Sequence, residues 1–381
     1  MKIVYDENIP CGREAFATLG AVTACAGRAI TPALVRDADL LFVRSVTEVN
    51  AALLDGSRVR FVATATSGSD HIDKPYLERA GIAYCDAIGS NAVSVAEYIT
   101  AALFVLSARM QVPLAGRSIA VIGVGHVGRL VVEKARALGM RVLMTDPPRA
   151  RAEKDFAHVP LDEALRADII TLHTPLTDDG IDATHHLLDG RRLAALTPGA
   201  WLLQASRGEV IDTRALGDLL AGGQRLHCVL DVWENEPHAD PDLLARTQLA
   251  TPHIAGYSWP SKINATQIIY EAACRFLGVA PVWQPPRLPE GVSPPSLTLA
   301  AQQPLPAQVS AAVTSVYDIL ADDQRMRALA HKAAAEQGAY FDYLRKTYPV
   351  RLEFRHTTVR GVTAAAARVL RELGFTVEAS R

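Results

Sequence analysis

An arginine, a glutamate and a histidine each come soon after a short apolar segment of this sequence, in the order Arg207, Glu236 and His253. The three segments are typical of buried strands and span residues 201–205, 227–230 and 249–252. Because ligands of open α/β sheets collect at the carboxyl ends of strands, we expect the three side chains to meet at one sheet edge. There a histidine can exchange a proton near neutral pH, and an arginine stays charged and can hold an anion.

A glycine-rich turn lies between a predicted strand at 118–122 and a predicted helix at 129–138. Its glycines have the G-x-G-x-x-G spacing, at Gly123, Gly125 and Gly128. This spacing allows a tight turn, the approach of a pyrophosphate and close packing of the helix on the sheet. The helix N-terminus offers free N–H groups near His126 and Val127, together with a partial positive charge. The segment therefore predicts a dinucleotide-binding βαβ unit.

Asp146 stands 18 residues after Gly128 and directly after a second predicted strand at 141–145. Its carboxylate can accept hydrogen bonds from the ribose hydroxyls of adenosine and would repel a 2′-phosphate. These properties favour NAD over NADP. Arg149 and Arg151 follow closely and keep NADP as the alternative cofactor.

Five motifs in this order make the sequence recognisable. They are the glycine loop with Asp146, followed by HTPL at 173–176, SRG at 206–208, DVWENEP at 231–237 and TPHIAG at 251–256. Over about residues 1–285 the pattern resembles the D-isomer-specific 2-hydroxyacid dehydrogenases. The resemblance implies an NAD-dependent oxidoreductase that moves a hydride between the C2 atom of a hydroxy acid and nicotinamide.

The catalytic arginine, glutamate and histidine of that family fall on Arg207, Glu236 and His253. In this interpretation His253 takes the hydroxyl proton, and Glu236 fixes the histidine tautomer and stabilises its protonated ring. Arg207 holds the substrate carboxylate and polarises the developing carbonyl. The cofactor contacts implied by the resemblance are Gly123, Gly125, His126, Val127, Gly128, Asp146, Thr174, Ala205, Ser206, Asp231 and Gly256. No pair of histidine and carboxylate residues has metal-ligand spacing, so we expect no metal.

The proline-rich stretch at 283–303 is typical of a linker. Together with the region after it, this stretch makes the chain most like one branch of the family. That branch oxidises 4-phospho-D-erythronate in vitamin B6 biosynthesis and acts as a homodimer. Because Arg207 can serve only the carboxylate of such a substrate, the phosphate needs other donors. The candidates for substrate binding are Arg44, Ser45, Thr66 and Tyr257. A C-terminal basic cluster either forms a solvated face or reaches the active site, and it comprises Arg345, Lys346, Arg351 and Arg355.

Two other functions stay open at this point. Another D-2-hydroxyacid dehydrogenase, such as one acting on 3-phosphoglycerate, would share the same motifs. A non-enzymatic, dinucleotide-sensing binding protein would also share them, because corepressors that resemble this family can keep the catalytic triad.

The patterns predict an α/β fold in which one domain is inserted in another. Predicted strands recur at βαβ-sized intervals over 93–257 and indicate a Rossmann-type, doubly wound parallel sheet that binds NAD. Long helical patterns at 91–109 and 260–278 would lead out of and back into a smaller α/β substrate domain. That domain would comprise 1–92 and 258–284 and, from the resemblance, be flavodoxin-like.

Residues 285–381 would form a C-terminal α+β dimerisation domain. Helical patterns occur at 309–320, 324–337 and 363–373, and strand-like patterns at 350–354 and 375–377. The folded part of this region begins at about residue 305, and a unit of roughly 75 residues folds alone only marginally, so we expect it to dock on another subunit.

The composition narrows the range of partners. A formal net charge of −2 gives no electrostatic footprint for nucleic acid or for an anionic membrane. The five cysteines lack C-x-x-C spacing, and neither a signal-peptide core nor an uninterrupted apolar run of membrane-spanning length is present. We therefore expect a cytoplasmic protein that acts on a small molecule and binds neither nucleic acid nor membrane.

Overall fold

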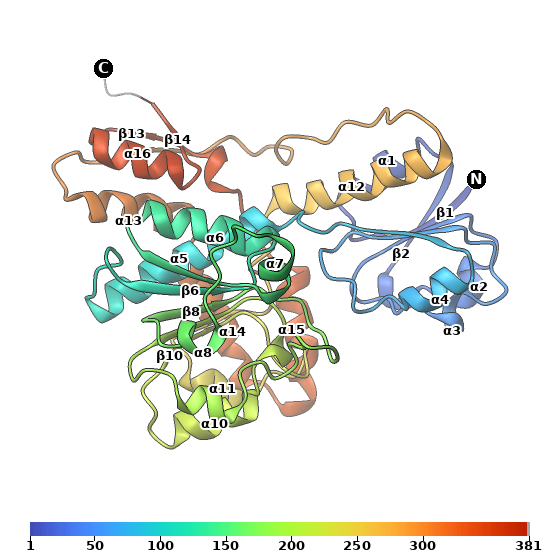
Figure 1. Cartoon of the computed structure of the whole chain (residues 1–381). Coiled ribbons are helices and arrows are strands. Elements are labelled where there is room, and N and C mark those ends of the chain that lie inside the picture. Colours follow the sequence, from blue (N-terminus) through green and yellow to red (C-terminus); the bar gives the residue numbers. More distant parts are fainter. Residues whose placement is uncertain (379–381) are drawn as a thin grey trace. The chain divides into compact units, whose positions relative to one another are not determined.

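The computed structural model describes residues 1–378. Its contacts divide the chain into two compact units, one of residues 1–91 with 258–293 and the other of residues 92–257 with 294–381. Figure 1 colours the chain along its sequence and labels elements of both units. Each unit is built on a parallel β-sheet covered by helices, which confirms the predicted α/β class.

The first unit contains a five-stranded parallel sheet in the order β2-β1-β3-β4-β5. Its strands are β1 (Lys2–Asp6), β2 (Ala21–Cys25), β3 (Leu40–Val43), β4 (Phe61–Thr64) and β5 (Ala83–Asp86). This is the order of flavodoxin-like sheets. The central strands β3 and β4 are fully buried, as is usual for parallel strands covered on both faces, and apart from Thr64 at the end of β4 they are apolar.

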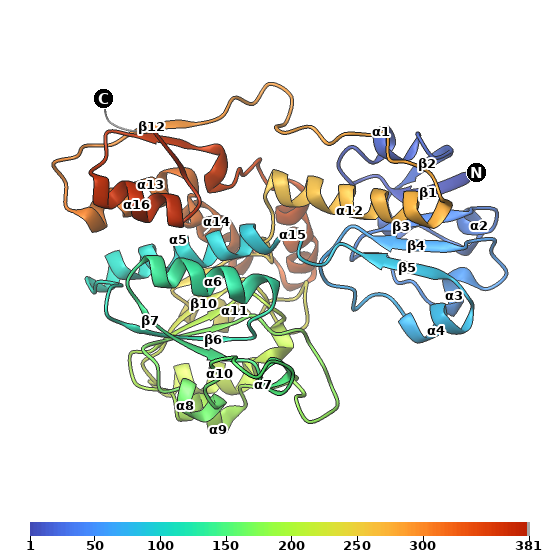
Figure 2. The ribbon, with the colours of Figure 1, turned by 45° about the horizontal axis from the view of Figure 1, so that its top comes forward.

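Helices cover both faces of this sheet, as Figure 2 shows. They are α1 (Gly12–Phe16), α2 (Pro32–Val35), α3 (Ala51–Leu54), α4 (Lys74–Arg79) and the long α12 (Trp259–Leu277). Phe16 of α1 and Ile269 of α12 share one core with the sheet, whereas Val35, Leu54 and Leu77 of the other three helices lie in a second core. Ser258 caps α12, because its hydroxyl accepts the Ser261 N–H at 3.1 Å.

The second unit contains a six-stranded parallel sheet in the order β11-β10-β9-β8-β6-β7. Its strands are β6 (Ser118–Ile122), β7 (Arg141–Thr145), β8 (Ile169–Leu172), β9 (Trp201–Gln204), β10 (His227–Leu230) and β11 (Leu249–Ala250). Beyond β7, His158 forms a single parallel bridge to Met144. With that bridge counted as a reduced third strand, the order becomes 3-2-1-4-5-6 with one added strand, which is the Rossmann arrangement.

Two apolar cores flank this second sheet. On one side α5 (Ala92–Met110) and α6 (His126–Ala137) pack against the strands. The helices between the later strands are α7 (Pro147–Ala152), α8 (Leu161–Ala164), α9 (Gly190–Ala194), α10 (Thr213–Ala221) and α11 (Pro241–Arg246). Of these, α8 to α11 contribute to the core on the opposite face.

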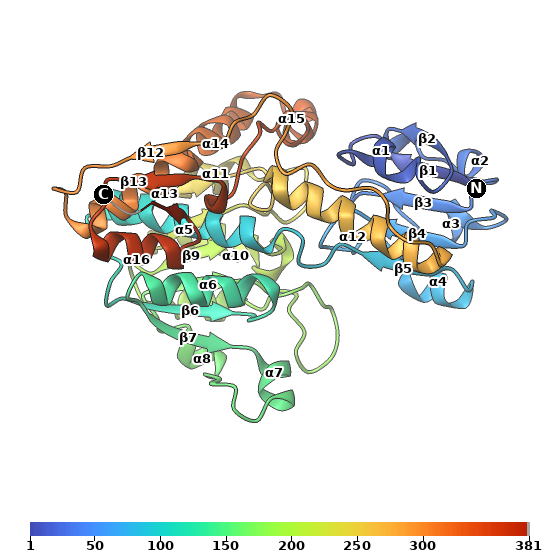
Figure 3. The same ribbon diagram turned by 90° about the horizontal axis from the view of Figure 1, so that it is seen from above.

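The C-terminal region packs into both cores of the second unit. Its elements are β12 (Ser296–Thr298), α13 (Leu305–Val316), α14 (Ile319–Arg327), α15 (Ala334–Lys346), β13 (Thr358–Arg360), α16 (Ala364–Glu372) and β14 (Thr376–Val377). Val313 and Leu370 enter the core of α5 and α6, and Figure 3 shows α16 beside these helices. Phe341 enters the opposite core, so the region covers apolar surface within its own chain.

Four C-terminal predictions need correction. The expected strand at 350–354 is absent, because its alternating pattern buries Arg351 and Glu353 in polar contacts rather than an apolar face. The expected helix at 309–320 is interrupted, since α13 ends at Val316 and α14 begins at Ile319 after the capping Asp318. The expected helix at 324–337 is interrupted as well, since α14 ends at Arg327 and α15 begins at Ala334. The proline-rich stretch contains β12, which pairs with β13.

Helix α5 is long and apolar enough to cross a membrane by length and composition, although we expected no such segment. It is the one helix within residues 1–378 that passes this test, and 72% of its most apolar window is buried in the second unit. Leu103 and Leu106 belong to the core that the helix forms with the sheet. This burial is that of a core helix.

Candidate active site

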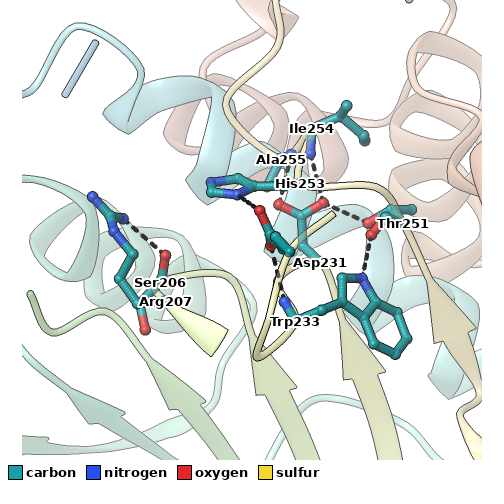
Figure 4. A network of polar contacts seen from close by, with 9 residues as sticks. Ser206, Arg207, Asp231, Trp233, Thr251, His253, Ile254 and Ala255 are labelled. Carbon is teal, nitrogen blue, oxygen red and sulfur yellow. Dashed lines mark hydrogen bonds and ion pairs between the residues drawn. The ribbon is translucent and has the colours of Figure 1, made fainter. Parts of the chain in front are cut away.

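The three charged residues singled out in the sequence follow neighbouring strands of the second unit. Arg207 follows β9, Glu236 lies on the loop after β10, and His253 follows β11. Figure 4 shows the side chains of Arg207 and His253 above the carboxyl ends of these strands. His253 and Glu236 are in direct contact, whereas Arg207 rises from the same edge on a separate loop.

His253 and Glu236 form a close pair. The Nδ1 atom of His253 lies 2.7 Å from Oε2 of Glu236, and Oε1 of Glu236 accepts the Trp233 N–H at 2.9 Å. Burial disfavours a charge on His253, but the Glu236 carboxylate outweighs it and raises the pKa of His253. Burial also opposes the charge on Glu236, yet His253 holds the pKa of Glu236 below its ordinary value. Since Nδ1 is engaged, Nε2 is the atom that can exchange a proton with a substrate.

Asp231 fixes the loop that carries His253. Its side chain is buried and accepts hydrogen bonds from the Thr251 hydroxyl at 2.6 Å and from two backbone N–H groups, those of Ile254 at 2.8 Å and Ala255 at 2.9 Å. Its backbone carbonyl accepts the His253 N–H at 2.7 Å. These contacts hold His253 at a φ of 56°, a left-handed conformation that is uncommon for residues other than glycine. Burial raises the pKa of the Asp231 carboxyl.

Gln204, the last residue of β9, shapes the loop that carries Arg207. Its Oε1 accepts both the N–H and the hydroxyl of Ser206, at 3.0 and 2.7 Å, and its Nε2 donates to the Arg207 carbonyl at 2.8 Å. Arg207 donates from Nη1 to the Ser206 carbonyl at 2.9 Å. The arginine therefore projects from a loop that is held by a buried amide.

Gly208 brings the Arg207 loop against the loop that carries Glu236. A Cβ at Gly208 would lie 2.1 Å from the carbonyl carbon of Trp233 and 2.3 Å from the Glu234 nitrogen. Because no side chain can be accommodated at such distances, the two loops can meet only if this residue is glycine. In the Ser-Arg-Gly motif, Gly208 is therefore required for packing, whereas Arg207 supplies the charge.

The glycine loop leads from β6 into α6, which begins at His126. A Cβ at Gly128 would lie 2.0 Å from the Gly123 carbonyl oxygen, so the first turn of the helix can lie against the loop only with glycine there. A Cβ at Gly125, in contrast, would meet no heavy atom within 4 Å. The loop therefore leaves open space at Gly125, where a pyrophosphate can approach the backbone and the helix N-terminus.

Asp146 lies beside this loop at the end of β7. Its Oδ2 accepts the Val124 N–H at 2.8 Å, and its Oδ1 accepts the Arg149 N–H at 3.1 Å and caps α7. Arg149 is paired with Glu153, at 2.7 Å between Nε and Oε1, and Arg151 is paired with Asp182. Both arginines that suggested NADP are thus engaged by carboxylates of the protein.

A cavity of about 630 Å³ lies next to Asp146 and the glycine loop. Its lining includes Gly123, Thr145, Asp146, Thr174 and Leu187. The hydroxyl of Thr174 is buried and has no hydrogen-bond partner among residues 1–378. A polar atom left in this state suits a ligand that supplies the missing partner. The open glycine, the cavity and the buried hydroxyl together fit a dinucleotide.

The remaining predicted cofactor residues lie on the same sheet edge. His126 and Val127 open α6, and Ala205 and Ser206 precede Arg207. Gly256 belongs to the turn that follows His253. The structure thus places all the predicted cofactor residues in the second unit.

The substrate candidates divide between the two units. Arg44 and Ser45 follow β3, and Thr66 comes shortly after β4, so they share one sheet edge of the first unit. Thr66 donates its hydroxyl proton to the Gly68 carbonyl at 2.7 Å. Tyr257 belongs to the second unit and follows His253 by one turn, with its N–H donating to the Ile254 carbonyl at 2.8 Å.

Three buried polar residues of the site were not singled out in the sequence. Gln204 shapes the Arg207 loop, and Thr251 links Asp231 to the Tyr98 hydroxyl of α5, at 2.8 Å between the two hydroxyl oxygens. A polar residue at the end of an otherwise apolar strand was the available signal for both Gln204 and Thr251. For Tyr98 no signal was available, because it lies within an apolar helix far away in the sequence.

The chain is similar to known proteins over nearly its whole length. Residues 91–255 match the family described as D-isomer specific 2-hydroxyacid dehydrogenase, NAD binding domain, and residues 292–374 match a domain of unknown function. Erythronate-4-phosphate dehydrogenase of Pseudomonas aeruginosa is 45% identical over 98% of this chain and 99% of its own length. The protein of the same name from Ectopseudomonas mendocina is 47% identical with the same coverage.

Solved structures with a similar fold cover about three quarters of the chain. NAD⁺-bound 3-phosphoglycerate dehydrogenase of Entamoeba histolytica has a TM-score of 0.63 at 25% identity and covers 73% of this chain and 95% of its own. D-lactate dehydrogenase of Aquifex aeolicus has a TM-score of 0.61 at 24% identity and covers 73% of this chain and 96% of its own. This second likeness concerns the fold alone.

Proposed function

Because the chain belongs to the D-isomer-specific 2-hydroxyacid dehydrogenases, we propose that it oxidises 4-phospho-D-erythronate at C2 with NAD as the oxidant. The C2 hydride would pass to the cofactor, and the hydroxyl proton to the protein. The products are then the 2-oxo acid, (R)-3-hydroxy-2-oxo-4-phosphooxybutanoate, and NADH. A step of this kind belongs to the synthesis of pyridoxal 5′-phosphate (vitamin B6).

The pair of His253 and Glu236 is the observation that carries this proposal. His253 takes the hydroxyl proton at Nε2, since its Nδ1 is held 2.7 Å from the Glu236 carboxylate. The same carboxylate stabilises the imidazolium that results, in agreement with the raised pKa of His253. Arg207 holds the substrate carboxylate through its planar donors and directs C2 toward the nicotinamide.

NAD would be held by the glycine loop, Asp146, Thr174 and the loops after β9 and β11. When bound, it supplies the acceptor for the hydride. Asp146 would turn its carboxylate from the Val124 N–H to the ribose hydroxyls, and α6 would direct its free N–H groups at the diphosphate. Arg149 and Arg151 do not favour NADP, because Glu153 and Asp182 already neutralise them.

The substrate is proposed from the relatives that match end to end. They share the C-terminal region as well as the catalytic motifs, whereas the 3-phosphoglycerate dehydrogenase structure covers only 73% of the chain. The full-length match therefore favours the phosphorylated four-carbon acid over 3-phosphoglycerate. It also favours an enzyme over a dinucleotide-sensing binding protein.

An absorbance assay at the wavelength of NADH tests this function. The purified chain is given NAD or NADP with 4-phospho-D-erythronate, 3-phosphoglycerate or D-lactate. We expect the highest kcat/KM with NAD and 4-phospho-D-erythronate. A higher kcat/KM with 3-phosphoglycerate would show that this acid is the substrate instead. No turnover with any of the acids would favour the alternative of a dinucleotide-sensing binding protein.

Assembly and location are part of the same proposal. We propose that the chain acts as a cytoplasmic homodimer, with residues 285–381 as the dimerisation region and residues 1–92 with 258–284 as the substrate domain. Arg44, Ser45 and Thr66 remain proposed substrate donors, because they lie at the strand ends where open α/β sheets take ligands.

A further inference from the structure

The C-terminal helix α15 places an arginine beside the catalytic pair. The guanidinium carbon of Arg345 lies 5.6 Å from the centre of the Tyr257 ring, and Tyr257 follows His253 by four residues. The positive charge of Arg345 acts on both Glu236 and His253 and by itself lowers the pKa of each. Of the C-terminal basic cluster, Arg345 therefore reaches the surroundings of the active site.

The position of Arg345 is set by rigid neighbours. Phe341 and Leu344 of the same helix are buried in the core of the second unit. Tyr348, just beyond the helix, packs edge-on against Tyr257 with ring centres 5.8 Å apart, and its hydroxyl donates to Asp322 at 2.8 Å. The arginine is thus held in place before any substrate arrives, which reduces the entropy lost on binding.

Arg345 has binding capacity that the protein itself does not use. Its Nε atom is buried and has no hydrogen-bond partner within residues 1–378. Burial lowers the pKa of Arg345, but Tyr257 and Glu236 outweigh it, so the side chain stays charged. A planar cation with an unused N–H suits an oxyanion that can accept two parallel hydrogen bonds.

We propose that Arg345, together with the Tyr257 hydroxyl, binds the phosphate of the substrate. This inference rests on the proposed function, in which Arg207 holds the carboxylate at the other end of the same molecule. A dehydrogenase that lacks the C-terminal region would lack this cation. The region would then contribute to substrate choice as well as to the cores of the second unit.

The other three members of the basic cluster differ from Arg345 in what they contact. Arg351 is buried and its Nη1 also lacks a hydrogen-bond partner among residues 1–378, but its Nη2 donates to the Ala255 carbonyl at 2.6 Å and to Ser94, so it already joins α5 to the loop that follows His253. Arg355 is paired with Glu353 at 2.9 Å. Lys346 is exposed at the end of α15 and provides a matched control next to Arg345.

The test compares kcat/KM for 4-phospho-D-erythronate with kcat/KM for D-erythronate. Arg345→Gln should lower the value for the phosphorylated acid by about 10- to 100-fold, since charge-assisted hydrogen bonds are lost. When both proteins are measured on the pH plateau above the acid limb, the value for D-erythronate should change less than about threefold, and Lys346→Gln should change neither value. Inorganic phosphate should inhibit the unmodified enzyme competitively and the Arg345→Gln variant more weakly.

A pH profile with D-erythronate separates this role from a purely structural one. Arg345, Glu236 and Asp231 are the charged groups that act on His253, and Arg345 is the one that lowers its pKa together with burial. In Arg345→Gln the acid limb of kcat/KM should therefore move to higher pH. If this variant does not fold, Arg345→Lys keeps the charge but not the planar donors and should retain part of the preference.

The outcomes distinguish the two proposals. If the unmodified protein does not prefer the phosphorylated acid, the proposed function fails. If it does and Arg345→Gln keeps the same preference, the function stands and the role of Arg345 is overturned.

Discussion

At the scale of single residues, the chemistry depends on the charge that Glu236 places next to His253. Burial alone would lower the pKa of His253, and the carboxylate at 2.7 Å reverses that effect. Oxidation needs the imidazole in its neutral form, so activity should fall as the pH drops below the pKa of His253. The carboxylate thus stabilises the proton after transfer and sets the pH range of the reaction.

Glu236→Gln removes the charge and keeps the shape of this pair. Without the negative charge the pKa of His253 falls, so the acid limb of kcat/KM should move to lower pH. The maximum rate should also fall, because the imidazolium loses its support. A steady-state pH series on both proteins checks this prediction, and an unchanged acid limb would show that Glu236 acts only in the structure.

The choice of cofactor is also decided by single residues. Asp146→Ala removes both the ribose acceptor and the charge that opposes a 2′-phosphate, so the ratio of kcat/KM for NAD over NADP should fall. Because Arg149 is paired with Glu153, NADP should gain less than NAD loses. Equal use of the two cofactors by the unmodified chain would contradict the role of Asp146.

At the scale of elements, the site depends on loops that approach one another more closely than side chains permit. Gly208→Ala would press a Cβ against the backbone of Trp233 and force the Arg207 loop away from the Glu236 loop. A shift of about 1 Å in such a site can lower activity by about 10²-fold, and we expect a loss of that order in kcat/KM.

The matched control is Gly217→Ala in the middle of α10, where the added Cβ meets no heavy atom within 4 Å. Alanine there should leave kcat/KM unchanged and leave the melting temperature equal or higher, because alanine favours a helix. If both variants have the same activity, the close approach at Gly208 does not set the geometry of the site.

Strands with a strong apolar pattern and motifs at their carboxyl ends were predictable from the sequence. The centres of β6 to β10 and the positions of Arg207, Glu236 and His253 on one edge follow from local pattern and from the rules of parallel sheets. The two edge strands of the first sheet, β2 and β5, are only partly buried, lack such a pattern and were not predicted. At 350–354 polar and apolar residues alternate as they do in a half-buried strand, but here the charged residues Arg351 and Glu353 are buried. The alternation alone cannot distinguish this case from a strand.

At the scale of the whole molecule, the C-terminal region is tied to the second unit through two cores. Its helices bury Val313, Phe341 and Leu370, so a small region that folds alone only marginally is stabilised by its own chain. The sequence could not show this packing, because the contacts join residues that are far apart in the chain. The same packing of the C-terminal region places Arg345 close enough to His253 for its charge to act on the imidazole.

Removal of residues 294–381 should expose the apolar surfaces of α5, α6 and α11 and cause aggregation. Light scattering of the intact chain should give about twice its mass of 41.0 kDa, as expected of a homodimer. A truncated chain that is soluble and still dimeric would show that the dimer interface lies outside the C-terminal region.

The central claim is that a hydride leaves C2 of the substrate for NAD while His253 takes the hydroxyl proton. It is tested most directly with 4-phospho-D-erythronate that carries deuterium at C2, followed by mass spectrometry of the reduced cofactor. We expect one deuterium in each NADH formed, and His253→Ala should lower the rate by about 10²- to 10⁴-fold with NAD affinity little changed. Reduced cofactor without deuterium, or full activity of His253→Ala, would contradict it.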